Sequence, residues 1–109
     1  MRAIPQLLFA LCAIGSAGPS DAADPKAALA RVQQVCAACH GVDGNSQLAD
    51  NPKLGGQYPD YLAKALRDYQ SGLRKNPVMA SFVDKLSNQD IENLAAYYSS
   101  QPSVLVIKQ

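Results

Sequence analysis

Two thiols and an imidazole lie within five residues of one another, at Cys36, Cys39 and His40 in the stretch Cys-Ala-Ala-Cys-His. His40 is the only histidine of the 109-residue chain. On one turn of a helix, positions i, i+3 and i+4 lie on the same face, so the three side chains would project together. Such a face can bind one group through two sulfur atoms and one nitrogen atom.

Cys-x-x-Cys-His is the attachment motif of c-type haem, whose vinyl groups form thioethers with the two cysteines while the histidine binds the iron. Three other uses of the thiols were weighed. A thioredoxin-like redox pair normally accompanies a βαβ unit, and the sequence shows no such unit. Structural zinc needs four ligands, whereas Cys36, Cys39 and His40 supply only three. A disulfide leaves the histidine unexplained. The residues therefore predict one covalently attached haem c.

The ligand on the other side of the iron separates electron transfer from ligand binding. Met79 is the only methionine besides Met1, and a second histidine ligand within the chain is excluded. A lone methionine is otherwise more often a core residue. Met79 lies in the segment 73–83, which Asn76-Pro77 predicts to be irregular, so a loop could turn its sulfur toward the iron. His40 and Met79 as axial ligands predict an electron carrier rather than an enzyme, with no small-molecule substrate at the iron.

Three amphipathic helices are expected to position these residues. They begin at Asp24-Pro25, at Pro59 and at Ser87, where Ser-Asn-Gln-Asp resembles a capping box. The second runs to Gln70 before Gly72, and the third should end near Gln101. Their apolar faces are Leu29, Val32 and Cys36 in the first, Tyr61, Leu62, Ala65, Leu66 and Tyr69 in the second, and Ile91, Leu94, Ala95 and Tyr98 in the third.

The connections between the helices, residues 41–58 and 73–83, are predicted as long irregular segments. Loops of such length in a compact domain are usually functional or wrapped around something. No alternating strand pattern precedes Val104, and no repeat is present. Small domains bury a smaller fraction of their surface than large ones, and three helices of this size have too few apolar side chains to form a core alone. The chain is therefore expected to be all-α and built around its bound group.

The N-terminal segment 1–22 predicts a cleaved secretory signal, with a positive start at Arg2, an apolar stretch and then small residues. Cleavage is expected after Ala22, which also removes Cys12. An uncleaved anchor is the alternative, disfavoured because the apolar run is short for a membrane span. The remaining segment 23–109 is then one exported, periplasmic domain. Its tail, residues 102–109, either docks on a surface or is loosely ordered.

The formal net charge is +1, so no strong field favours nucleic acid or an anionic membrane as a partner. Neither nucleic acid nor an anionic membrane is therefore an expected partner.

Taken together, these residues resemble class I c-type cytochromes, and specifically the bacterial cytochrome c4/c553 group. The resemblance is carried by Cys36 to Gly41, Pro52 to Gln57, Tyr61-Leu62, Leu66, Met79, Leu86-Ser87 and Leu94 to Tyr98. It implies the cytochrome c fold, with three main helices and long loops wrapped around one covalently bound haem. Many cytochrome c4 proteins carry two such domains, whereas this chain has one attachment motif.

The resemblance also implies particular contacts. The Pro52 carbonyl should accept a hydrogen bond from the second ring nitrogen of His40 and fix its tautomer. The first and last helices should cross, with Leu94 and Tyr97 in the contact, and one haem edge should stay exposed. Candidate contacts to the haem propionates are Tyr58, Tyr61, Arg67 and Arg74.

The function expected from these features is a periplasmic electron carrier that cycles between ferric and ferrous iron and shuttles electrons between redox proteins. A membrane-bound oxidase or reductase is one candidate for such a partner. Two alternatives stay open. One is a cytochrome subunit held by a larger oxidase or dehydrogenase through the apolar tail. The other is a haem protein whose labile sixth site binds small ligands.

Overall fold

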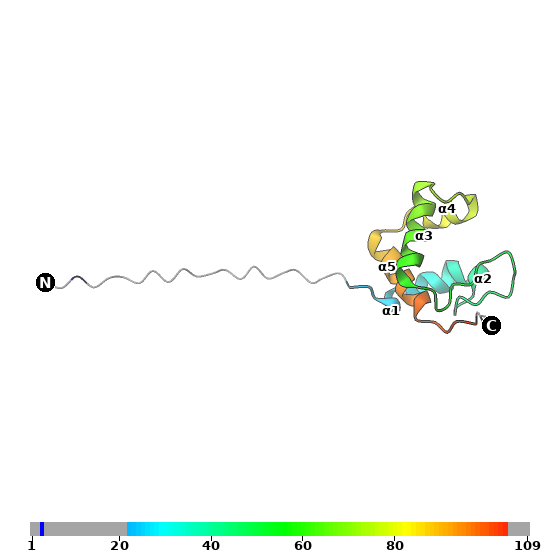
Figure 1. Cartoon of the computed structure of the whole chain (residues 1–109), viewed down its shortest axis with the longest axis horizontal. Helices are drawn as coiled ribbons and strands as arrows, with labels where there is room; N and C mark the ends of the chain where they lie inside the picture. Colours follow the sequence, from blue (N-terminus) through cyan, green and yellow to red (C-terminus); the bar gives the residue numbers. More distant parts are fainter. Residues whose placement is uncertain (1–2, 4–21, 105–109) are drawn as a thin grey trace, which may run out of the picture.

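The structure, a computed structural model, describes residue 3 and residues 22–104 (Figure 1). Regular structure within this part is helical throughout: α1 (Pro25–Arg31), η1 (Val32–Cys36), α2 (Ala37–His40), α3 (Pro59–Ser71), α4 (Pro77–Val83) and α5 (Asn88–Ser99). No strand occurs among the described residues, which confirms the all-α prediction. Most of the predicted signal segment and residues 105–109 of the tail lie outside the described residues. None of the helices described is long and apolar enough to cross a membrane.

The starts of the first and last helices follow from local capping. The Asp24 side chain accepts a hydrogen bond from the Lys26 backbone N–H, with Pro25 in the first turn. At α5, Ser87 and Asp90 form the reciprocal capping box, each side chain accepting from the other's backbone N–H at 3.0 Å. Both predicted starts are confirmed, and α5 ends at Ser99, slightly before the expected Gln101.

Helix α3 begins and ends close to the predicted positions. Pro59 occupies its first turn, and Gly72 follows its last residue in the left-handed conformation, with φ of 80°. A residue without Cβ adopts this conformation at no steric cost. The chain can therefore leave α3 sharply and turn toward α4.

The first helical segment contains a wider turn that the sequence pattern did not predict. At the end of η1, the Ala37 N–H donates to the carbonyl of Val32, five residues earlier, as in a π-helix. Before this turn, Ala28 and Val32 are 4% and 0% exposed, whereas Leu29 is 39% exposed. The prediction that Leu29 lies on the buried face is wrong, because Ala28 of α1 and Val32, the first residue of η1, form the buried i, i+4 pair instead.

The segment 73–83 is not irregular throughout, which corrects the expected count of three helices. The Asn76 side chain accepts hydrogen bonds from the N–H groups of Val78 and Met79, at 3.0 and 3.1 Å. Pro77, which prevents α3 from continuing, fits the first turn of a new helix. Met79 therefore lies in the short helix α4 rather than in a loop.

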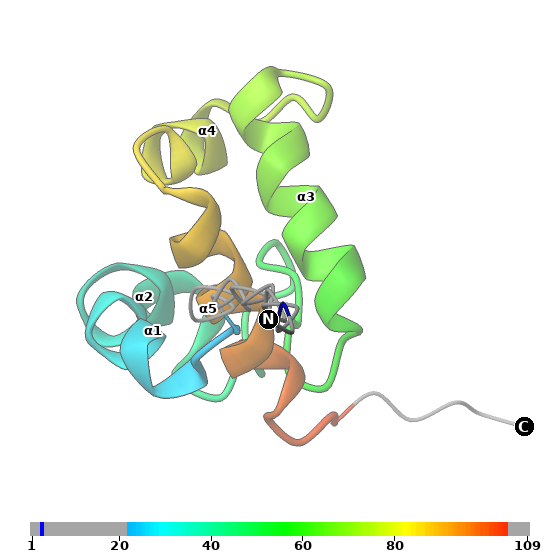
Figure 2. The ribbon, with the colours of Figure 1, turned by 90° about the vertical axis from the view of Figure 1, so that its left-hand side faces the viewer.

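The core gathers around α5, which packs against both α1 and α3 (Figure 2). Ile91, Leu94, Ala95 and Tyr98 are each at most 4% exposed, as the periodicity predicted. Leu94 and the 8%-exposed Tyr97 both belong to this core, and α1 crosses α5 as the family resemblance implies.

The loop 41–58 is held tightly against α5 at two glycines. A Cβ on Gly44 would lie 2.7 Å from the Gly55 nitrogen and from the Tyr98 ring. A Cβ on Gly55 would lie 2.6 Å from the Pro102 carbonyl oxygen, which accepts a hydrogen bond from the Asn45 side chain at 2.8 Å. The start of the C-terminal tail is thus fixed against this loop.

Candidate functional site

A cavity of about 740 Å³ opens between the helices and is lined by residues from every helix of the described part. This volume lies within the range of about 300–1,000 Å³ that is typical of cofactor and ligand sites. The walls are largely apolar. The cavity therefore suits one large, mostly apolar group.

Helix α3 turns its predicted apolar face toward this cavity rather than entirely toward other helices. All five residues of that face line the cavity: Tyr61, Leu62, Ala65, Leu66 and Tyr69. Leu94, Ala95 and Tyr98 of α5 line it as well. The amphipathic pattern in the sequence thus marks the surface of a binding site as much as a protein core.

Cys36, Cys39 and His40 all line the cavity, as expected from their spacing on one helical turn. Both cysteines are free thiols, Cys36 half-buried and Cys39 exposed. Burial raises the pKa of the Cys36 thiol, while the positive charge of Arg31 acts in the opposite direction. Cys36 is therefore a protonated thiol at neutral pH, and less reactive toward a disulfide than a thiolate would be.

The imidazole of His40 is only 7% exposed and is oriented by the loop that follows it. Its Nδ1 lies 2.8 Å from the Pro52 carbonyl oxygen. A carbonyl can only accept, so Nδ1 carries the proton and Nε2 keeps its lone pair. This hydrogen bond selects the tautomer that can bind a metal, as is usual for ligating histidines.

Met79 lines the same cavity as His40 and is half-buried. It occupies the first turn of α4, where the Asn76 side chain accepts a hydrogen bond from its N–H. The structure thus brings the two candidate axial ligands to one cavity. Within the part of the chain that the structure describes, no group of three or more His, Cys, Asp or Glu residues could hold a metal ion.

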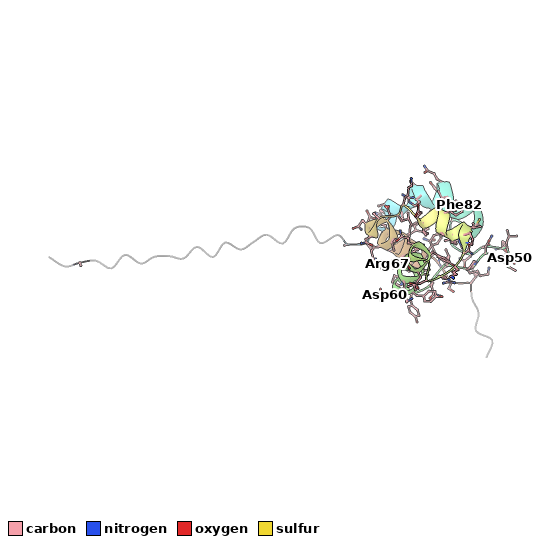
Figure 3. All side chains as sticks on the ribbon, turned by 90° about the horizontal axis from the view of Figure 1, so that it is seen from above. Asp50, Asp60, Arg67 and Phe82 are labelled. Carbon is pink, nitrogen blue, oxygen red and sulfur yellow. The ribbon has the colours of Figure 1, made fainter. Side chains whose placement is uncertain are left out.

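Of the four candidate propionate contacts, Tyr61 and Arg74 line the cavity. The Arg74 guanidinium carbon lies 5.0 Å from the centre of the Tyr69 ring. Tyr58 is 79% exposed and does not line the cavity. Arg67 forms an ion pair with Glu92 at 2.5 Å and lies away from Asp50, a cavity residue (Figure 3).

Three side chains near the site make contacts that the sequence did not predict. Tyr97 and Tyr98 donate hydrogen bonds to the carbonyls of Val42 and Gly41, at 2.7 and 3.2 Å. Gln70 donates to the carbonyls of Val83, the last residue of α4, and of Leu86. The periodicity marks Tyr98 only as an apolar position, Tyr97 enters only as a helix contact that the family resemblance implies, and nothing in the sequence pattern singles out Gln70.

The residues present fit a covalently attached porphyrin. The thiols of Cys36 and Cys39 line an apolar cavity together with the imidazole of His40, whose Nε2 is free to bind a metal. The thioether of Met79 lines the same cavity from another helix. This donor set and the helical fold around it define a class I c-type cytochrome.

Comparison with known proteins identifies the family. Residues 23–97 match the family model described as "Cytochrome C oxidase, cbb3-type, subunit III". The chain is 34% identical to cytochrome c-553 of Helicobacter pylori, over 84% of this chain and 93% of that protein. It is 44% identical to cytochrome c4 of Stutzerimonas stutzeri, over 87% of this chain and 50% of the relative.

The fold agrees with these matches. Reduced recombinant cytochrome c4 from Pseudomonas stutzeri is similar with a TM-score of 0.69 at 46% identity, covering 74% of this chain and 47% of that one. The chain thus spans about half the length of the cytochrome c4 relatives. It belongs to the c-type cytochrome family that this model describes, and its cofactor is haem c, which confirms the prediction from the motif.

Proposed function

We propose that this chain carries single electrons between redox proteins on one haem c, with His40 and Met79 as the axial ligands. The observation that supports this most directly is that the oriented imidazole of His40 and the sulfur-bearing side chain of Met79 line the same cavity. When bound, haem supplies an iron that changes between the ferric and ferrous states.

The side chains around the cavity have distinct roles in this proposal. Cys36 and Cys39 anchor the porphyrin covalently, and the Pro52 carbonyl keeps Nε2 of His40 available for the iron. The soft thioether of Met79 favours the ferrous state and raises the reduction potential. With both axial positions filled by the protein, no substrate binds at the metal, so the role is that of a carrier and not of an enzyme.

The proposal includes export to the periplasm, because the sequence of residues 1–22 has the layout of a secretory signal. Residues 23–109 would then form the mature single-haem domain. Donor and acceptor would be redox proteins that make brief contacts near the cavity opening. N-terminal sequencing of the secreted protein tests the expected cleavage after Ala22.

The optical spectrum of the oxidised protein tests the ligand assignment. We expect a methionine-to-iron charge-transfer band in the native protein, and its loss together with a lower reduction potential in Met79→Ala. Ser81→Ala is the control on the same helix, because Ser81 of α4 is exposed and does not line the cavity. A native protein without the band, or Met79→Ala retaining it, would contradict the assignment and favour a labile sixth position.

A second candidate function is that of a cytochrome subunit in a larger oxidase or dehydrogenase, supported by the description of the matching family model. The apolar tail would hold the complex. Because Pro102 is fixed by Asn45, a deletion should begin at Leu105 to spare the domain. Size measurement after gentle purification then decides: a large complex that the deletion reduces to a monomer supports the subunit role, and a monomer in both cases contradicts it.

A further inference from the structure

Helix α4, which carries Met79, has few side chains buried against other helices. Val83 is 2% exposed, whereas Val78, Met79 and Phe82 line the cavity and would face the porphyrin rather than another helix. The helix has seven residues, far fewer than a helix needs to be stable alone in water. Its position therefore depends on its attachment to α3, beside which it lies (Figure 2).

One side chain makes that attachment at the C-terminal end of α4. The Nε2 of Gln70, in the last turn of α3, donates to the Val83 carbonyl at 2.8 Å and to the Leu86 carbonyl at 2.9 Å. Val83 is the last residue of α4, and Leu86 directly precedes Ser87, the cap of α5. A single amide thus joins α3 to the end of α4 and to the start of α5.

At the N-terminal end of α4, the side-chain hydrogen bonds among the described residues come from the helix's own segment. Asn76 accepts hydrogen bonds from the N–H groups of Val78 and Met79, which caps the helix from within its own segment. Such a cap stabilises the helix but does not fix its position relative to α3. The bonds from Gln70 do fix it, because they cross to another element.

We propose that Gln70 is a positioning residue for Met79: its two hydrogen bonds hold α4 so that the sulfur stays at the iron. This inference rests on the proposed function, in which Met79 is the axial ligand. Without these bonds, α4 can move away from α3 and the sulfur leaves the sixth position more often. An external ligand can then bind in its place.

Imidazole binding to the oxidised holoprotein tests the proposal, followed through the methionine-to-iron charge-transfer band. Gln70→Glu keeps the length of the side chain and removes its donors at neutral pH, and Gln70→Leu does so without adding a charge. We expect both variants to bind imidazole about 5- to 30-fold more tightly, the factor that corresponds to one or two lost hydrogen bonds. Gln70→Lys retains donors and should return binding close to that of the native protein.

Gln89→Glu is the control on α5, since Gln89 donates a hydrogen bond there to the Asn93 side chain, whereas its second acceptor, Ala22, leaves with the predicted signal. It should lower the urea midpoint measured by far-UV circular dichroism without changing imidazole affinity. The same measurement verifies that every variant is folded without urea.

The outcomes separate this inference from the proposed function. Unchanged imidazole affinity in Gln70→Glu and Gln70→Leu would overturn the positioning role, and so would an equal increase in Gln89→Glu, which would indicate general destabilisation. If the native protein lacks the band and Met79→Ala binds imidazole as the native protein does, the axial assignment itself fails. If the native protein shows the band and the Gln70 variants bind imidazole with the native affinity, the positioning role of Gln70 is refuted while the proposed carrier function remains.

Discussion

Adjacent tyrosines at the end of α5 fix the residues that follow the haem ligand. Tyr97 donates to the Val42 carbonyl at 2.7 Å, and Tyr98 to the Gly41 carbonyl at 3.2 Å. Their rings meet edge to face, with centres 5.1 Å apart. Since Gly41 directly follows His40, these contacts connect the core helix α5 to the segment that positions the imidazole.

Removal of the Tyr97 hydroxyl should have a measurable cost. In Tyr97→Phe the Val42 carbonyl loses its donor, so the free energy of unfolding should fall by about 1 kcal/mol. Urea unfolding monitored by circular dichroism measures the change. Tyr98→Phe is the control with the longer hydrogen bond and should lose less; a larger loss there would show that the distances do not rank the two bonds.

The same tyrosines predict how stability responds to alkaline pH. Burial raises the pKa of both hydroxyls. In the unfolded chain a tyrosine loses its proton near pH 10, whereas in the folded protein it keeps it to higher pH. Above about pH 10 the unfolded state is therefore favoured, and the stabilisation present at lower pH is lost as pH rises toward the folded pKa.

Urea unfolding at pH 8 and at pH 11 tests this expectation. The native protein should lose more stability between the two than Tyr98→Phe, which lacks one of the ionisable groups. Equal losses would mean that Tyr98 does not contribute to the alkaline transition.

At the scale of secondary structure elements, two glycines with positive φ are required for different reasons. Gly72 ends α3 with φ of 80° and has no atom within 4 Å of a Cβ position. Gly44, with φ of 74°, is in close contact with Gly55 and the Tyr98 ring. The first position is restricted by backbone conformation alone, and the second by conformation and packing together.

Alanine substitutions should separate these two effects. Gly72→Ala should reduce the free energy of unfolding by about 1–2 kcal/mol, the cost of a left-handed residue with a Cβ. Gly44→Ala should lose clearly more, because the loop must move away from α5. Thermal unfolding of the two variants compares them directly, and similar losses would indicate that the loop adjusts without cost.

The elements also show what could be predicted from the sequence. Helices α3 and α5 were predicted because periodicity, Gly72 and the Ser87 capping box all agree on their limits. Helix α4 is not predicted, because Asn76-Pro77 interrupts a helix that would run through it, although the same pair starts a new helix. The hydrogen bond between His40 and Pro52 followed only from the family resemblance, since no local pattern connects the two residues.

At the scale of the whole molecule, the interior consists of two parts, a protein core around α5 and a cavity of about 740 Å³. Sequence patterns could not distinguish them, because a side chain facing porphyrin and one facing protein are equally apolar. The apolar face of α3 is directed at the cavity, so much of its burial depends on the cofactor. The domain should therefore be stable only with haem attached.

Loss of both anchoring thiols tests this dependence. Cys36→Ala with Cys39→Ala should give a protein with little helical signal in far-UV circular dichroism, because the porphyrin fills the interior that α3 and α5 share. The single variant Cys39→Ala, which keeps one thioether, should retain more helix. Native-like helicity in the double variant would show that the protein core suffices.

The wide turn of η1 separates two halves of one continuous helical segment that face different neighbours. The first half contributes Ala28 and Val32 to the hydrophobic core, and the second presents Cys36, Cys39 and His40 to the cavity. Each residue advances a regular helix by about 100°, and the wide turn contains one residue more than a regular turn. This additional residue determines how the side chains of the second half are rotated relative to those of the first. Deleting one residue from 32–36 ahead of Cys36 would leave the helix and the Cys-x-x-Cys-His motif intact. It would nevertheless turn the two cysteines and His40 away from the cavity.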